Sequence, residues 1–218
     1  MAARFEVNVL VGSPVFGGDK LYNCLVVFDR QGAVSHCYAK CHLTDMDRAH
    51  FSSGHAVALF EIDGICATTV ICHERRYPEL VRLAVMAGAR ILFHPNAGMD
   101  TLEVSTKKRD GRDGIVARAF ENAIYYIFAN SVGPQGNDKW SAGDSKIVAP
   151  DSRVLSIADN ESEAVISADL DLSQATGVYA QRGMTEPPFL ASHWEGMLTA
   201  LRQQAEDAAV GFDLPGKG

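Results

Sequence analysis

Short apolar runs of strand length, each bounded by turn-forming residues, recur along this chain and restrict its fold more than any other feature. Two patterns with helical spacing lie among them, at residues 78–89, where Pro78 occupies a first-turn position, and at residues 113–122. The alternation of strands with helices predicts an α/β fold. The expected strands cover residues 7–13, 21–29, 32–39, 56–62, 64–72, 90–95, 123–131, 145–149, 153–158 and 164–170.

The end of the chain adds two expectations about its organisation. Residues 145–149 and 153–158 flank a Pro-Asp-Ser turn and predict a hairpin, so the sheets should be mixed rather than purely parallel. Residues 189–208 predict a helix that must dock through one apolar face, formed by Leu190, Trp194, Met197, Leu198 and Leu201. Because no repeat or linker interrupts the pattern, we expect a single domain over residues 1–207 and a tail over residues 208–218.

Composition restricts the partners of the protein. The formal net charge of -7 and the isoelectric point of about 5.5 give no attraction for phosphate backbones or anionic lipid. No stretch approaches the roughly 18 apolar residues of a membrane span, and the first residues lack the pattern of a signal peptide. Five cysteines, an odd number, favour reduced thiols. We therefore expect a cytoplasmic protein with no nucleic-acid or membrane partner.

Cys72 lies where an apolar strand stops and a charged segment begins. Residues 64–72 have the pattern of a buried strand and Pro78 opens a helix, which places Cys72 on a strand-to-helix turn. Backbone N–H groups at a helix start stabilise both a thiolate and an oxyanion, and Arg75 and Arg76 add positive charge. Cys72 is thus a candidate nucleophile, although a cysteine at a strand end is more often an inert, buried thiol.

The segment GICATTVICHERRYPE, followed by the helix LVRLAVMAGA and the strand RILFHPNA, resembles the nucleophile region of the nitrilase superfamily of carbon–nitrogen hydrolases. Three further segments, GDKLYNCLVVFDRQGAVSHCYAKCHL, VARAFENAIYYIFANSVG and WSAGDSKIVAPDSRVLSIA, resemble other motifs of the family, and the similarity runs from about residue 7 to about residue 171. The resemblance implies an α-β-β-α sandwich with mixed sheets and assembly as a homodimer or higher homo-oligomer. The residues in the order of the nucleophile motif are Cys72, Arg76, Tyr77, Pro78 and Glu79.

The resemblance also implies an activity. It is the hydrolysis of a non-peptide carbon–nitrogen bond, in a small amide or N-carbamoyl compound, through a thioester on Cys72 and without a metal or organic cofactor. Lys40 falls on the catalytic lysine of the family, which would stabilise the tetrahedral intermediate together with the amide of His73. Strand alternation alone would make Lys40 a solvent-facing residue.

Four residues are candidates for contact with the substrate or the developing oxyanion. His73 and Glu74 follow the nucleophile directly, whereas Asn96 and Ala97 follow the strand at residues 90–95. Ligands of α/β proteins bind beyond the carboxyl ends of strands, which favours the second pair. Arg109 and Arg112, in a charged run, are alternative partners for a substrate carboxylate, but a solvated loop is the simpler interpretation of that run.

The general base of the family is a glutamate that precedes the lysine motif. Only Glu6 precedes Lys40, and it lies in a segment that resembles the part following that glutamate. We therefore expect the chain to be an amino-terminally truncated member that lacks this glutamate and the opening strand-helix-strand portion. Asp47 lies near the position of a second, supporting glutamate in many members, although an exposed loop acid is an equal alternative.

Three hypotheses follow from this pattern. The first is an amidase-type hydrolase, and the second is a catalytically impaired member that acts as a binding module or partner subunit. In the third, the natural chain begins further upstream. A metal site in HCYAKCH is not expected, because on a strand Cys37 and Cys41 are roughly 13 Å apart, whereas two thiolates on one zinc lie within about 4.6 Å.

Overall fold

The computed structural model describes residues 1–107, 114–186, 188–210 and 212. Its larger sheet has six strands in the order β12-β11-β8-β6-β5-β4. The central strands β5, β6 and β8 run parallel and the remaining pairs are antiparallel, so the sheet is mixed as predicted. The strands are β4 (Phe60–Ile62), β5 (Ile65–Thr69), β6 (Ile91–Asn96), β8 (Tyr125–Asn130), β11 (Lys146–Val148) and β12 (Val154–Ile157).

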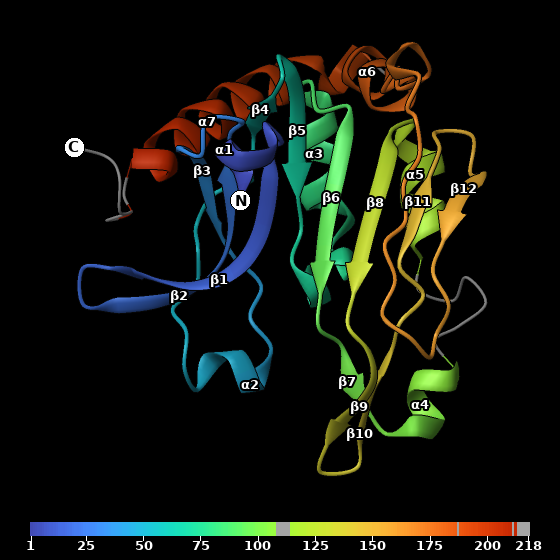
Figure 1. Cartoon of the computed structure of the whole chain (residues 1–218). Coiled ribbons are helices and arrows are strands. Elements are labelled where there is room, and N and C mark those ends of the chain that lie inside the picture. Colours follow the sequence, from blue (N-terminus) through green and yellow to red (C-terminus); the bar gives the residue numbers. More distant parts are fainter. Residues whose placement is uncertain (108–113, 187, 211, 213–218) are drawn as a thin grey trace.

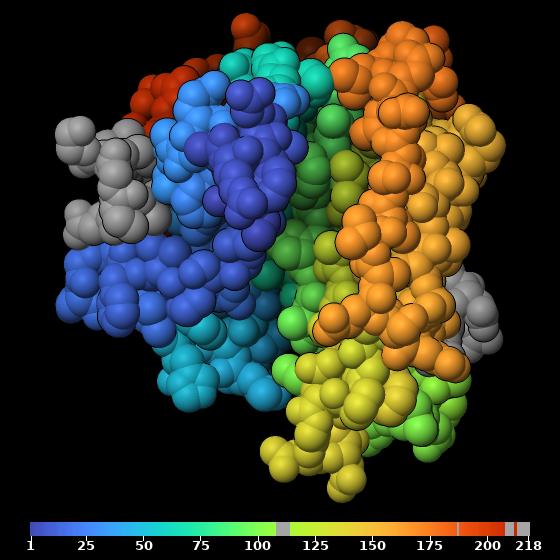
Figure 2. Space-filling view, viewed as in Figure 1, coloured from blue at the N-terminus to red at the C-terminus, as the bar shows by residue number. Residues whose placement is uncertain are grey.

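A second, antiparallel sheet faces the first across an apolar interior (Figure 1). It consists of β1 (Val9–Gly17), β2 (Lys20–Phe28) and β3 (Val34–Ala39). Because neighbouring residues of a strand point to opposite faces, β2 directs Leu25 and Val27 into this interior, where they meet Ile91 and Tyr125 of the larger sheet. Figure 2 shows the green residues of the larger sheet recessed between the blue strands β1 and β2 and the orange segment before α6.

Helices cover the other face of the larger sheet. They are α3 (Pro78–Met86), α5 (Ile115–Asn122), α6 (Val178–Thr185) and α7 (Ala191–Val210). Helix α7 packs on this layer through Leu198 and also contacts β3 of the second sheet. Val85 of α3, Ile115 of α5 and Leu198 of α7 pack with Leu92 and Tyr126 of the sheet in one buried cluster. Burial of such a side chain contributes roughly 1.5–3 kcal/mol, so this layer supplies much of the stability. The helix layer, the larger sheet and the second sheet therefore correspond to three of the four layers of the expected α-β-β-α sandwich.

Shorter elements complete the fold. The helices α1 (Ala2–Phe5), α2 (Asp45–Arg48) and α4 (Leu102–Lys107) are single turns or slightly longer. A small antiparallel sheet of β7 (Met99–Asp100), β10 (Lys139–Ala142) and β9 (Val132–Gly136), which the sequence patterns did not indicate, lies beyond the carboxyl ends of β6 and β8 (Figure 1). Three 3₁₀ turns cover Cys72–Arg76, Leu172–Gln174 and Pro188–Leu190.

One expected strand is wrong. Residues 164–170 form no strand in the structure, and Val165 is 99% exposed. Only Leu170, at the end of this segment, packs into the cluster between the sheets. An alternating pattern is not sufficient for a strand, because the backbone also needs a neighbour to pair with. Every other expected strand overlaps a strand of the structure, and residues 145–149 and 153–158 form the predicted hairpin.

The last helix docks through a narrower face than the sequence indicates. Leu198 and Leu201 are buried, and Trp194 packs against the cluster that contains Leu198, whereas Met197 is 45% exposed. Helix α7 continues to Val210, into the segment expected to be a tail, and residues 211 and 213–218 lie outside the described part. Among the described residues, no helix has the length and hydropathy needed to cross a membrane.

Candidate active site

Cys72 begins the 3₁₀ turn that leads from β5 to α3. Its φ angle is 52°, in the left-handed region, which is uncommon for a residue with a side chain and must be held by surrounding contacts. The Cys72 carbonyl oxygen accepts hydrogen bonds from His94 Nε2 at 3.0 Å and Arg75 Nη1 at 3.4 Å. The thiol is half-buried, on the predicted strand-to-helix turn.

Lys40 directly follows β3 and is almost completely buried, with a side chain 2% exposed. Its ammonium lies 2.6 Å from Asp47 Oδ2. Asp47 belongs to the one-turn helix α2, where it forms a capping box with Thr44. Lys40 is thus not a solvent-facing lysine, and its charge is held in place by a carboxylate.

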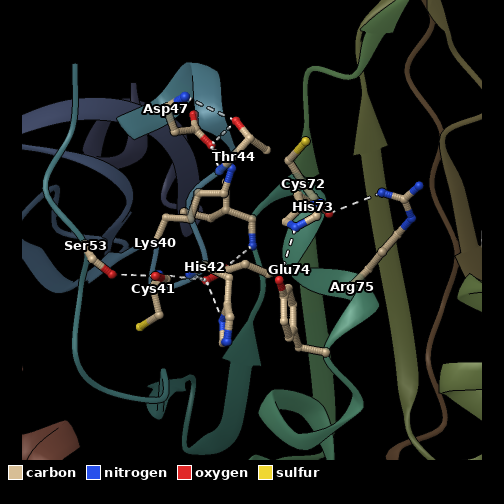
Figure 3. A network of polar contacts seen from close by, with 12 residues as sticks. Lys40, Cys41, His42, Thr44, Asp47, Ser53, Cys72, His73, Glu74 and Arg75 are labelled. Atoms are coloured by element: carbon tan, nitrogen blue, oxygen red, sulfur yellow. Dashed lines mark hydrogen bonds and ion pairs between the residues drawn. The ribbon is translucent and has the colours of Figure 1, made fainter. Parts of the chain in front are cut away.

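The expectation that Asp47 could be an exposed loop acid is wrong. The side chain is 16% exposed and reaches Lys40 despite its short length. Burial raises the pKa of Asp47, but hydrogen bonds from Lys40 and Thr44 outweigh burial and leave this pKa below its usual value. Asp47 is therefore ionised at neutral pH and forms a true ion pair. Figure 3 shows Lys40 and Asp47 reaching the site from the β3 and α2 side, opposite Cys72 and His73 on the β5 side.

The expectation that Glu74 contacts the substrate is wrong. Its side chain is 0% exposed, which leaves no surface for a ligand. Burial raises the pKa of Glu74, although the hydrogen bonds that it accepts oppose the rise. The carboxylate oxygens of Glu74 accept hydrogen bonds of 2.7 to 3.1 Å from the Tyr38 hydroxyl and from the backbone amides of Cys41, His42 and Ile71. These bonds connect the turn of Cys72 to the segment that carries Lys40.

Glu74→Gln is expected to lower the free energy of unfolding by roughly 2–4 kcal/mol. The substitution replaces one acceptor oxygen with an amino group that faces N–H donors, so buried donors lose their partner. Urea unfolding followed by circular dichroism measures the loss. Glu79→Gln, at an exposed neighbouring position, is the matched control and should change stability by less than about 0.5 kcal/mol. Equal stability of the two variants would contradict the supporting role of Glu74.

Two histidines contact Tyr77 near Cys72. The ring of His42 stacks on Tyr77 with centroids 3.7 Å apart, and His73 Nε2 lies 3.4 Å from the Tyr77 hydroxyl. Burial lowers the pKa of His73, and the positive charges of Arg76 and Lys40 lower it further. The His73 imidazole is therefore neutral at neutral pH. The site carries its positive charge on lysine and arginine.

Asn96 and Ala97 lie at the carboxyl end of β6, on the same edge of the sheet as the turn after β5. Asn96 Nδ2 donates to Asn130 Oδ1 at 2.7 Å, and Asn130 Nδ2 donates to the Gly143 carbonyl at 2.8 Å. Ala97 is exposed. Asn130 was missed by sequence reasoning, although a polar residue at the end of a strand parallel to β6 was a usable signal. This pair of amides places polar groups at the same edge of the sheet as the turn of Cys72.

The remaining sequence candidates lie elsewhere. Arg109 and Arg112 fall outside the described residues. Within the ranges that the structure describes, no group of three or more His, Cys, Asp or Glu side chains could hold a metal ion. The groups that the described site brings together are the Cys72 thiol, the buried ammonium of Lys40 and the backbone amides of the turn after Cys72.

The fold and site define an α/β protein with a cysteine after the parallel strand β5 and a buried lysine after β3 of the antiparallel sheet. The sequence model of the carbon–nitrogen hydrolase family matches residues 1–180. The chain therefore belongs to the carbon–nitrogen hydrolase family, within the nitrilase superfamily that the motifs resemble.

Individual relatives agree with this assignment. The 2-oxoglutaramate amidase of Bacillus subtilis is 29% identical over 181 residues, which cover 81% of this chain and 67% of the relative. The chloroplastic omega-amidase of Arabidopsis thaliana is 30% identical over 186 residues, covering 79% and 48%. The crystal structure of a carbon–nitrogen hydrolase from Helicobacter pylori G27 superposes with a TM-score of 0.75 at 22% identity, covering 85% of this chain and 69% of that chain. The chain spans about two thirds of the first relatives, 63% of one and 67% of another.

Proposed function

We propose that the protein hydrolyses the carbon–nitrogen bond of a small amide or N-carbamoyl compound, with Cys72 as the nucleophile. The observation that carries this proposal is the placement of Lys40, a buried lysine held by Asp47 at 2.6 Å, across the site from a half-buried thiol on a strained turn. Burying an ammonium costs free energy, so its retention there favours a chemical role over a structural one. Two relatives are named as amidases, which supports an amide as substrate.

The chemistry needs two steps. The sulfur of Cys72 attacks the carbonyl carbon, and the oxygen becomes an anion that Lys40 Nζ and the His73 amide stabilise. The carbon–nitrogen bond then breaks, the nitrogen leaves as ammonia or an amine with the proton of the thiol, and an acyl thioester remains. Water attacks the thioester, releases the acid and returns a proton to the sulfur. No metal or organic cofactor takes part.

Transfer of the thiol proton distinguishes an active enzyme from an impaired one. The resemblance gives this transfer to a glutamate before the lysine motif, and no glutamate preceding Lys40 in this sequence matches it. General acid–base help is typically worth 10²–10⁴-fold in rate, so its loss would slow turnover without removing the nucleophile. The second candidate function is a binding module or partner subunit, and the rate of turnover separates it from the hydrolase.

The test combines turnover with trapping of the intermediate. The 218-residue protein is incubated with butyramide, glutaramate and N-carbamoyl amino acids, and released ammonia is measured. Intact-mass spectrometry of the quenched reaction detects an acyl group on the protein, and peptide mapping locates it. We expect ammonia release and an adduct on Cys72. An adduct without turnover would favour the impaired enzyme, and absence of both would refute the hydrolase.

We also propose that the protein is cytoplasmic and assembles as a homodimer or higher homo-oligomer. Both parts rest on the composition and on the family resemblance. Sedimentation velocity at micromolar concentration tests the second part, because a monomer of 23.6 kDa and a dimer sediment separately. A single monomeric species across the concentration range would overturn it.

A further inference from the structure

His94 lies in the middle of β6 and is 1% exposed. Both of its ring nitrogens have partners: Nε2 lies 3.0 Å from the carbonyl oxygen of Cys72, and Nδ1 lies 2.9 Å from the hydroxyl of Tyr126 on β8. The three residues come from different parts of the chain and meet at the turn that carries the nucleophile. Nothing in the chemistry proposed above uses His94.

The partners determine where the proton of the ring lies. A backbone carbonyl only accepts hydrogen bonds, so Nε2 must carry the hydrogen and donate it to Cys72. In a neutral ring Nδ1 is then an acceptor, and the Tyr126 hydroxyl must donate to it. Burial lowers the pKa of His94 to about 3, with the charge of Arg75 adding to the effect. The ring therefore stays neutral, with a single tautomer, throughout the physiological pH range.

A contact with the Cys72 carbonyl also determines the direction of the next amide. The peptide unit is planar and trans, so the C=O of Cys72 and the N–H of His73 lie in one plane and point in opposite directions. The φ of Cys72, 52°, is not one that the residue would adopt unaided. The His73 amide belongs to the first turn of the 3₁₀ segment, where N–H groups have no acceptor within the helix. It is thus available to an anion.

We propose that His94 is a positioning residue that clamps the Cys72–His73 peptide, so that the His73 amide faces the oxyanion of the tetrahedral intermediate. Tyr126 acts behind it by holding the tautomer of the ring. The inference rests on the proposed hydrolase function for its kinetic consequence. Its geometric content, a neutral histidine that donates to the carbonyl of the nucleophile, is independent of that function.

The kinetic test compares His94→Leu with His94→Gln. Removal of an oxyanion donor typically costs 10²–10³-fold in kcat, so its misorientation in His94→Leu should cost roughly 10–100-fold, with KM changed less than about 3-fold. Gln can donate an N–H near the place of Nε2 and should recover activity to within about 5-fold of the wild type. Alkylation of Cys72 by iodoacetamide, which develops no oxyanion at this amide, should change less than about 3-fold in either variant.

The matched control is a pair of neighbouring tyrosines. Tyr126 and Tyr125 are both buried on β8, and each hydroxyl makes a 2.9 Å contact, but Tyr125 donates to the carbonyl of Asp171 instead. Tyr126→Phe is expected to lower kcat by roughly 3–10-fold, a fraction of a donor's full worth, whereas Tyr125→Phe should leave it unchanged. All rates are expressed per folded molecule, with the folded fraction taken from circular dichroism.

Several results would overturn the inference. These are a wild-type kcat in His94→Leu, no recovery in His94→Gln, equal losses in the two tyrosine variants, or alkylation that falls in parallel with kcat. If the wild-type protein hydrolyses no amide, the hydrolase proposal fails and the clamp is tested without turnover. Nitrogen-15 shifts of the His94 ring should then report a neutral Nε2–H tautomer from pH 5 to pH 8, consistent with the pKa of about 3. A protonated ring or the Nδ1–H tautomer in that range would refute the clamp.

Discussion

Cys72→Ala should reduce amide hydrolysis to the background rate, a loss of roughly 10⁴-fold or more if the hydrolase proposal is right. The thiol supplies the covalent bond to the acyl group, and no neighbouring group can replace it in that step. Ammonia release under saturating amide measures the loss. The same variant should show no acyl adduct by intact mass.

A second thiol, on the strand β5 that precedes Cys72, gives the matched control for Cys72→Ala. Cys66 is also half-buried, but it lies at the start of β5, whereas Cys72 follows the end of that strand. Burial raises the pKa of Cys66, which reduces its thiolate fraction. Cys66→Ala should retain wild-type activity. Ammonia release by Cys72→Ala at the rate of Cys66→Ala would contradict the assignment of the nucleophile.

Lys40→Met should lower both kcat and stability. Loss of an oxyanion partner predicts a decrease in kcat of roughly 10²–10³-fold. The change also leaves Asp47 without its cation in a largely buried place, which should cost roughly 2–4 kcal/mol, less than a fully buried pair because Asp47 keeps some exposure. Turnover of a small amide and urea unfolding measure the two effects.

Two controls separate the effects of Lys40→Met. The double variant Lys40→Met/Asp47→Asn removes the uncompensated carboxylate and should recover stability without recovering kcat. The ion pair of Lys146 and Asp144 is also 2.6 Å long and similarly buried. Lys146 begins β11 and Asp144 lies just before it, three strands from β5 and so about 14 Å away. Lys146→Met should therefore lose comparable stability but keep its activity per folded molecule. If Lys40→Met keeps wild-type kcat, the ammonium has no role in the reaction.

The network around Glu74 explains how two distant segments form one site. Lys40 and Cys72 follow strands of different sheets, so neither sheet alone fixes the distance between them. Glu74 accepts hydrogen bonds from both segments, while His94 holds the Cys72 carbonyl from the neighbouring strand. A buried carboxylate that accepts hydrogen bonds from both segments restricts how they move relative to each other, which the proposed chemistry requires.

Local sequence patterns were sufficient to predict most of the strands and helices and the turn that carries Cys72. Alternation and turn residues located the strands, and Pro78 with the preceding apolar run placed Cys72 on a strand-to-helix turn. These features depend on neighbours within a few residues, because backbone geometry and side-chain direction repeat over short distances along a chain. Ordered motifs then indicated the family, which the match over residues 1–180 confirms.

Tertiary structure alone decided what depends on partners far apart in sequence. Residues 164–170 have the alternating pattern of a strand but form no strand, because a strand requires a neighbouring backbone to pair with. Glu74 looked like a substrate contact and proved to be a buried anchor, and Asp47 reached a lysine that strand alternation would have placed in solvent. The sequence does not distinguish a carboxylate that contacts substrate from one that is buried as an anchor. The difference lies in desolvation and hydrogen bonding, which the surrounding tertiary structure determines. The sequence by itself therefore determined most of the strands and helices and the place of Cys72 on its turn, because these depend on near neighbours in the chain. Tertiary packing decided which charged side chains lie around that turn.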